Sequence, residues 1–202
     1  MSGTINAIET RYAGCRFRSR LEARWAVFFD TLGIRWEYEP QGYTVDDECY
    51  LPDFWLPETE TWVEVKGSSE GLRADSERLT TILDGNSPLP GMMDSHGTSG
   101  DVCHGMLFLG PVPAPSGLIL HPIVQHHEGL WWEWAYFEPR KFRPYIRTLA
   151  NPGPELAFFY HVPECVAWSA APLEVASPYT YPVVKDAYAA ARSARFEHGE
   201  RG

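Results

Sequence analysis

Residues 50–67 read YLPDFWLPETETWVEVKG, and they are predicted to form one antiparallel hairpin around which the rest of the chain is built. Two runs rich in aromatic and β-branched residues, 54–56 and 62–65, have the composition of strands. The proline and the polar residues at 57–60 supply a turn between them. The stretch therefore predicts two adjacent strands of one sheet.

The register of this hairpin brings two acids and a lysine together. In a symmetric hairpin Phe54 faces Val63, and Asp53 then faces Glu64 with their Cβ atoms about 4.5–5.5 Å apart. Lys66 is two residues beyond Glu64, and side chains two apart on a strand point to the same face. We therefore expect one face to carry both carboxylates and the ammonium group.

Two like charges opposed across strands are destabilising, and here they stand among residues that normally cover a core. A divalent cation would remove the conflict, because Mg²⁺ and Mn²⁺ bind one or two carboxylates while keeping water ligands. The simpler interpretation is a surface hairpin in which Lys66 pairs with Glu64 and Asp53 is solvated. The spacing alone does not decide between the two.

A helix is predicted at 20–32, upstream of the hairpin. Its apolar stripe consists of Leu21, Trp25, Phe28, Phe29 and Leu32. Gly33 is a typical residue for the end of a helix. Ser19 and Glu22 have the spacing of a capping box, in which Glu22 only holds the start of the helix. A functional carboxylate at Glu22 is the alternative, and both interpretations stay open.

Pro52-Asp53, followed by Glu64-Val65-Lys66 on the next strand and preceded by a helix that carries Glu22, resembles the signature of the PD-(D/E)xK nuclease superfamily. The resemblance covers residues 12–84, and residues 106–110 by strand character. Phage and bacterial members with a compact glutamate-bearing helix are the most similar. The resemblance implies the restriction-endonuclease-like fold.

The same resemblance implies a metal-dependent deoxyribonuclease that uses Mg²⁺ or Mn²⁺. Asp53, Glu64, the Val65 carbonyl and Glu22 would be the metal ligands. Lys66 would join Glu22, Asp53 and Glu64 as a catalytic residue, by orienting water or stabilising negative charge. Two alternatives stay open: a noncatalytic nucleic-acid-binding or regulatory protein on this fold, and a nuclease that acts on RNA.

The predicted fold class is α/β, with an α-β-β-β-α-β core and a mixed sheet. Beyond the hairpin and the helix at 20–32, the core comprises a strand at 34–39, a helix at 70–83 and a strand at 106–109. We expect this nuclease core at 12–110, after an irregular start at 1–11. A β-rich extension packed on the same domain would follow at 111–202. It would contain strands at 117–124 and 129–137 and a C-terminal helix at 182–196.

The net charge of −10 counts against nucleic-acid binding by overall electrostatics. The distribution of charge is more favourable, because five of the 17 basic residues lie between positions 11 and 24. Among them, the predicted DNA contacts are Arg16, Arg18, Arg20 and Arg24. A solvated helix face is an equally good interpretation of each. The aromatic run at 131–137 is more typical of sheet packing than of base stacking.

The 202 residues contain no apolar run of 18 or more, and the first residues lack the pattern of a secretory signal. We therefore expect no membrane association and a cytoplasmic location. The four cysteines are scattered singly, which favours reduced thiols over disulfides or a zinc site. The sequence leaves a homodimer or a protein partner open.

Overall fold

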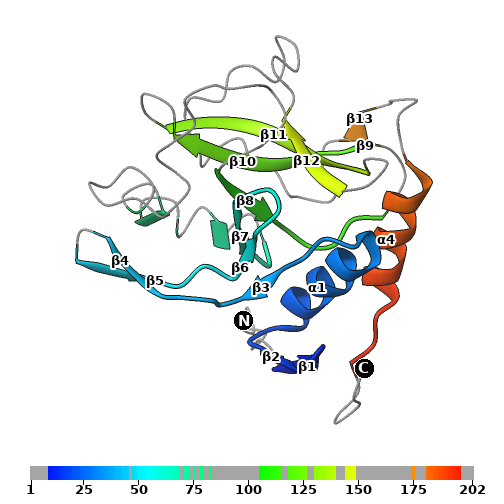
Figure 1. Ribbon diagram of the computed structural model, residues 1–202, viewed down its shortest axis with the longest axis horizontal. Helices are drawn as coiled ribbons and strands as arrows, with labels where there is room; N and C mark the ends of the chain where they lie inside the picture. Colours follow the sequence, from blue (N-terminus) through cyan, green and yellow to red (C-terminus); the bar gives the residue numbers. More distant parts are fainter. Residues whose placement is uncertain are drawn as a thin grey trace, which may run out of the picture.

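The computed structural model describes residues 9–45, 47–68, 71–72, 75, 78–79, 82, 105–114, 118–126, 130–139, 144–148, 174–175 and 181–196. They form a mixed α/β structure built on a seven-stranded sheet (Figure 1). In order across the sheet, its strands are β12 (Pro144–Thr148), β11 (Leu130–Pro139), β10 (His121–His126), β8 (Gly105–Leu109), β7 (Thr61–Val65), β6 (Phe54–Leu56) and β3 (Glu37–Tyr38). The neighbours β7 and β8 are parallel, and the other neighbouring pairs are antiparallel.

The predicted hairpin is confirmed with its register. Phe54 pairs with Val63, and Leu56 pairs with Thr61. Glu60 in the connecting turn has a φ of 48°, a left-handed conformation that lets the chain reverse sharply. The hairpin lies inside the sheet, because β3 covers its β6 side and β8 covers its β7 side.

Three small two-stranded sheets accompany the main one. They are β1 (Thr10–Tyr12) with β2 (Cys15–Phe17), β4 (Tyr43–Val45) with β5 (Glu48–Tyr50), and β9 (Leu118–Ile119) with β13 (Glu174–Val175). The expectation of an irregular start up to residue 11 is therefore wrong from Thr10 onward. Ala13 and Gly14 have φ values of 47° and 81°, and two such residues make a turn whose twist matches that of the strands.

Two helices lie side by side on one face of the sheet, as Figure 1 shows: α1 (Arg20–Leu32) and α4 (Pro182–Ser193). The predicted bounds of α1 are confirmed. Its first turn is capped by Ser19, whose hydroxyl oxygen accepts the Glu22 N–H, and Gly33 ends it at a φ of 71°. Such a φ disfavours a side chain, which explains the glycine.

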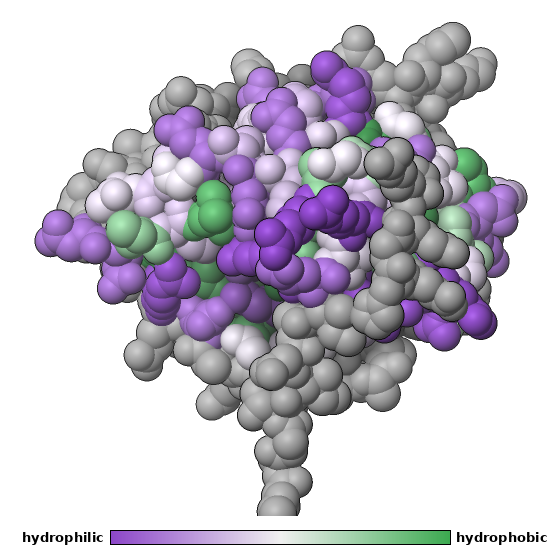
Figure 2. Space-filling model, turned by 90° about the horizontal axis from the view of Figure 1, so that it is seen from below, coloured by the Kyte–Doolittle hydropathy of each residue, from purple (hydrophilic) through white to green (hydrophobic). Residues whose placement is uncertain are grey.

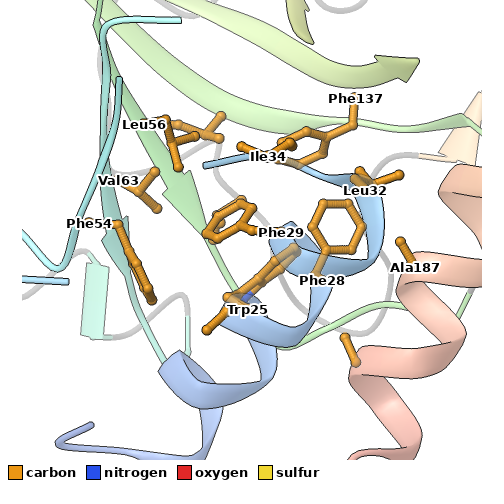
Figure 3. Close-up of a cluster of buried hydrophobic side chains, with 14 of the residues drawn as sticks. Trp25, Phe28, Phe29, Leu32, Ile34, Phe54, Leu56, Val63, Phe137 and Ala187 are labelled. Carbon is orange, nitrogen blue, oxygen red and sulfur yellow. The ribbon is translucent and has the colours of Figure 1, made fainter. Parts of the chain in front are cut away.

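The larger core lies between these helices and the sheet (Figure 3). Trp25, Phe28 and Phe29 project from α1 toward the hairpin strands and β11, and Ala187 approaches from α4. The ring centroids of Phe28 and Phe137 are 4.8 Å apart. Each ring of this size removes a large apolar area from water, so this core is expected to dominate the stability of the protein.

The opposite face of the sheet has its own core. Alternate residues of β7 and β8 point here, among them Trp62, Met106 and Phe108, and they pack against Leu72, Leu79 and Ile82. The described residues between 71 and 82 are helical, in agreement with the helix predicted at 70–83. The sheet is thus covered on both faces, as the long apolar run in β8 requires.

Two predicted strands differ from the structure by more than their end residues. The strand predicted at 34–39 is reduced to Glu37–Tyr38, because the Ile34 N–H is used to cap α1 on the Phe29 carbonyl at 2.9 Å. The strand predicted at 117–124 divides at Leu120 into β9 and β10, which join different sheets.

The predicted C-terminal helix ends three residues early, at Ser193. Ala194 has extended backbone angles, and the chain then carries the Phe196 ring to within 6.0 Å of the Tyr12 ring. Helix α4 and strands β10–β12 belong to the predicted extension. The three strands extend the sheet that contains the hairpin, and α4 packs into the larger core.

No helix in the described part of the chain has the length and apolar character needed to cross a membrane. Cys15 and Cys49 are free thiols, as expected, and the other two cysteines lie outside the described residues. The tryptophan side chains of the run at 131–137 also lie outside the description. Phe137 of that run is buried in the larger core.

Candidate active site

Asp53 lies directly before β6, where the hairpin register places it opposite Glu64. Its side chain is buried, with 4% of its surface exposed. The carboxylate oxygen Oδ2 accepts the backbone N–H of Val65 at 2.7 Å. The other oxygen, Oδ1, accepts from the Arg18 guanidinium, also at 2.7 Å. Both oxygens are therefore engaged, one by the neighbouring strand and one by a side chain.

Glu64 occupies the facing position on β7 and is also buried. Its Oε2 accepts the hydroxyl of Tyr50 at 2.6 Å, and its Oε1 lies 2.9 Å from the ammonium nitrogen of Lys66. The same ammonium group contacts Asp75, from the helical residues that cover this face. The predicted gathering of Asp53, Glu64 and Lys66 around one end of the hairpin is confirmed as geometry.

The electrostatics of the pair show the conflict expected from the sequence. Burial raises the pKa of Asp53 well above its usual value, and the negative charges of Glu64 and Glu22 raise it further. The Val65 N–H and the Arg18 guanidinium act in the opposite direction. The site thus disfavours its own negative charge and is better satisfied when a further cation or a proton is present.

The charge of Glu64 also raises the pKa values of Tyr50 and Lys66. Burial raises the pKa of Tyr50 well above its usual value, and Glu64 adds to the rise, so this hydroxyl stays a donor. Burial alone would lower the pKa of Lys66, but the charge of Glu64 and the contact with Asp75 outweigh it, and the pKa is raised. Lys66 is therefore a protonated, cationic group at neutral pH.

The structure confirms that Glu22 takes part in capping α1, and its role as a functional carboxylate stays a prediction. Its oxygens accept the Ser19 hydroxyl at 2.7 Å, the Arg18 N–H at 3.0 Å and the Tyr38 hydroxyl at 2.6 Å. Ser19 accepts the Glu22 N–H at 3.2 Å, as in a capping box, while the Glu22 carboxylate reaches back to the N–H of Arg18, one residue before the N-cap. The charge of Glu22 also acts on Asp53. A side chain at the first turn of a helix can cap it and still face the site.

Arg18 links Asp53 to a further acid, Glu39. The Arg18 Nε lies 2.5 Å from Oε1 of Glu39, while its Nη2 contacts Asp53. Glu39 has a φ of 44°, and its backbone N–H donates to the Asp53 carbonyl at 2.9 Å. A left-handed glutamate is strained, and such residues concentrate at functional sites.

The four arginines predicted to contact DNA have different surroundings. Arg16 pairs with Glu9, and Arg18 pairs with the acids of the site. Arg20 is exposed and Arg24 is half-buried. Figure 2 shows the face at the bottom of Figure 1, where hydrophilic residues cover most of the described surface and hydrophobic ones occur in small patches.

The donor set fits a hard divalent cation. Asp53 and Glu64 are two buried carboxylates at facing positions of the hairpin, and Mg²⁺ commonly takes one or two carboxylates from a protein. Within the described ranges, no group of three potential ligand residues is close enough together to enclose an ion. Each of the two acids forms an ion pair with a basic side chain: Asp53 with Arg18, and Glu64 with Lys66.

Comparison with known proteins finds no family model that matches the chain, and no similar curated protein or solved structure. The function must therefore be inferred from the geometry of the site itself.

Four residues of the site were not predicted: Tyr38, Glu39, Tyr50 and Asp75. Tyr50 stands at the start of the hairpin stretch, and a tyrosine three residues before the acid was the signal available. Asp75 approaches Lys66 only through the packing of the helical residues at 71–82 on the sheet. No local pattern in the sequence marks such a contact.

Proposed function

We propose that this protein is a metal-dependent nuclease that hydrolyses DNA phosphodiester bonds. The observation that carries the proposal is the pair of buried acids, Asp53 and Glu64, opposed across the hairpin with the Lys66 ammonium 2.9 Å from Glu64. A scaffold has no need for two facing buried carboxylates, because their mutual repulsion is destabilising. Binding of a divalent cation that takes part in catalysis would explain the presence of both carboxylates.

The order of elements supports the proposal. Along the chain, α1 is followed by β3, β6, β7, helical residues at 71–82 and β8, with the small β4–β5 hairpin inserted. This α-β-β-β-α-β order with a mixed sheet is the one that the resemblance implies. We therefore propose a restriction-endonuclease-like core at 12–110, extended at 111–202 by β10–β12 and α4.

Asp53 and Glu64 would hold Mg²⁺ or Mn²⁺, with the Val65 carbonyl as a further ligand and Glu22 completing the set directly or through water. The metal, when bound, supplies Lewis acidity and a water of lowered pKa. The protein supplies rigidity: Asp53 is fixed by the Val65 N–H and Glu64 by the Tyr50 hydroxyl. Such outer contacts orient the oxygens before any ligand arrives, which favours a preorganised site.

Lys66 would act on the phosphate. Its ammonium group is held between Glu64 and Asp75, and it is protonated at neutral pH because both acids favour the charged form. A fixed positive charge at this point stabilises the negative charge that develops on phosphate oxygens. Arg16, Arg18, Arg20 and Arg24 are proposed to contact the DNA backbone, which requires no sequence recognition.

The proposal is tested by incubating labelled linear, circular, single-stranded and branched DNA, and a matched RNA, with Mg²⁺, Mn²⁺ or EDTA. We expect cutting of DNA that depends on the divalent ion and falls by at least about 100-fold in Asp53→Asn and Lys66→Ala. Glu58→Gln is a matched control, because Glu58 lies in the hairpin turn and pairs with Arg35, away from these acids. Absence of cutting in the wild type, or equal cutting by the site variants, would contradict the proposal. Preferential cutting of RNA would favour the RNA nuclease instead.

A second candidate is a noncatalytic nucleic-acid-binding or regulatory protein. The observation that favours it is the pairing of both acids with basic side chains, since Arg18 and Lys66 offset the charges without a metal. Under this alternative, DNA would bind equally well with and without divalent ions, and no substrate would be cut. A filter-binding titration in Mg²⁺ and in EDTA distinguishes the two.

A further inference from the structure

Arg18 holds the acid that the proposed nuclease would use for its metal. Its Nη2 is 2.7 Å from Oδ1 of Asp53, and its Nε is 2.5 Å from Oε1 of Glu39. The Asp53 side chain is buried, whereas that of Arg18 is 56% exposed. The guanidinium thus reaches a buried oxygen from the solvent side of the site.

The two oxygens of Asp53 differ in how easily they can be released. Oδ2 accepts the N–H of Val65, a backbone group of the sheet that cannot move away. Oδ1 accepts from a half-exposed side chain, whose departure disturbs no element of the fold. A cation that binds Asp53 therefore takes the oxygen held by Arg18.

The backbone of Arg18 is fixed while its side chain can turn. The Arg18 N–H lies 3.0 Å from Glu22 Oε2 and 3.0 Å from the Tyr38 hydroxyl, which anchors the residue at the start of α1. Glu39 is anchored by its own N–H on the Asp53 carbonyl. When Nη2 leaves Asp53, Nε can stay on Glu39, so the guanidinium remains at the edge of the site.

We propose that the Arg18 guanidinium and a divalent cation compete for Oδ1 of Asp53, so that cation binding releases Arg18 toward a substrate phosphate. This inference rests on the proposed function and adds the order of events: the arginine becomes free for phosphate only after the metal is in place. Arg18 is thus a positioning residue that keeps the empty acid neutralised and couples metal binding to nucleic-acid binding.

The first test is Mn²⁺ binding, measured by electron paramagnetic resonance of the free ion without nucleic acid. The guanidinium must leave Oδ1 before the ion can bind there, so Arg18→Gln should bind Mn²⁺ on the order of tenfold more tightly than the wild type, which is about 1.4 kcal/mol. Arg16→Gln is the matched control. It removes the same charge at a position two residues from Arg18, and the Arg16 side chain is paired with Glu9 instead of Asp53. We expect its Mn²⁺ affinity to stay within about twofold of the wild type, because exposed charges are screened.

The second test follows Arg18 itself. Phenylglyoxal modifies accessible arginines, and mass spectrometry of peptides gives the rate at each position. Saturating Mn²⁺ should raise the modification rate of Arg18 several-fold in the wild type, because the guanidinium is no longer bound to Asp53. Arg16 serves as the internal reference. The Asp53→Asn variant should show a fast Arg18 rate that no longer depends on Mn²⁺.

Equal or weaker Mn²⁺ binding by Arg18→Gln, or an Arg18 modification rate that Mn²⁺ leaves unchanged, would overturn the competition. Failure of the proposed function has a different signature. In that case Mn²⁺ binding and the Arg18 response would be found as expected, while no DNA is cut. Absence of Mn²⁺ binding in both the wild type and Arg18→Gln would also overturn the inference.

Discussion

The imidazole Nε2 of His121 and the hydroxyl oxygen of Tyr188 lie 2.7 Å apart, and together they join β10 to α4 inside the larger core. Both side chains are buried, at 4% and 2% exposure. Burial lowers the pKa of His121 to about 3 and raises that of Tyr188 well above its usual value. The contact is therefore a neutral hydrogen bond in an apolar setting.

The first prediction is that Tyr188→Phe destabilises the protein by about 1–3 kcal/mol, because the ring still packs but the buried imidazole loses its partner. For a chain of this size, each kcal/mol corresponds to roughly 2–4 °C in Tm. Differential scanning calorimetry gives the shift. A Tm equal to that of the wild type would show that His121 finds another partner.

The second prediction concerns pH. The pKa of His121 is about 3 in the folded state and about 6.5 when unfolded, so the unfolded chain binds more protons between these values. The contribution of neutral His121 to the free energy of unfolding is fully present above pH 6.5. It is lost as the pH falls from 6.5 toward 3, by at most about 1.4 kcal/mol per pH unit. Urea titrations at pH 7.5, 5.5 and 4.5 should show a smaller fall for His121→Gln than for the wild type.

The third prediction is that Asp53→Asn is more stable than the wild type in the absence of divalent ions. Burial, and then the charge of Glu64, raise the pKa of Asp53, so its negative charge is unfavourable there, and asparagine removes that charge. We expect a higher Tm for Asp53→Asn than for the wild type when both are heated in EDTA. Asp186→Asn is the control, because Asp186 is exposed on α4 and should change little. A clear loss of stability in Asp53→Asn would mean that the Arg18 pair outweighs the repulsion.

The fourth prediction is that Tyr50→Phe costs about 1–3 kcal/mol, since a buried oxygen of Glu64 loses its 2.6 Å donor. Tyr12→Phe is a matched control. Its hydroxyl donates to Asp30 at the surface, at 2.8 Å, and water can replace it, so about 0.5 kcal/mol is expected. Chemical denaturation of both variants measures the difference, and equal losses would argue against a special role for Tyr50.

The fifth prediction separates the two roles of Glu22. Ser19→Ala removes the helix cap and should cost about 1 kcal/mol while leaving metal-dependent cleavage near the wild-type rate. Glu22→Gln keeps an acceptor for the cap but removes the charge near Asp53, and we expect cleavage to fall by at least about tenfold. Cleavage rates are compared at a temperature where both variants are folded. Normal cleavage by Glu22→Gln would leave Glu22 with the capping role alone.

The sequence predicted the hairpin, its register and α1 because each depends on local signals. Alternating strand residues set the Phe54–Val63 pair, and Ser19 and Gly33 mark the ends of the helix. Since the register fixes which residues face each other, the approach of Asp53, Glu64 and Lys66 followed from it.

What could not be predicted depends on tertiary packing. For Arg18 the sequence offered a DNA contact or a solvated helix face, although its side chain reaches Asp53, a residue 35 positions away. Glu39 takes its left-handed conformation where the chain turns out of β3, and its own residue type favours no such turn. The break at Leu120 arises because β9 and β10 pair with different strands, which no periodicity within 117–124 encodes.

The position of β7 between two other strands of the sheet has a consequence for unfolding by heat. Its backbone is bonded to β6 on one side and β8 on the other, so its amide hydrogens are expected to exchange with deuterium only when the whole sheet opens. Glu64 and the Val65 N–H that fixes Asp53 both belong to this strand. The site and the fold should therefore be lost together, at a single temperature.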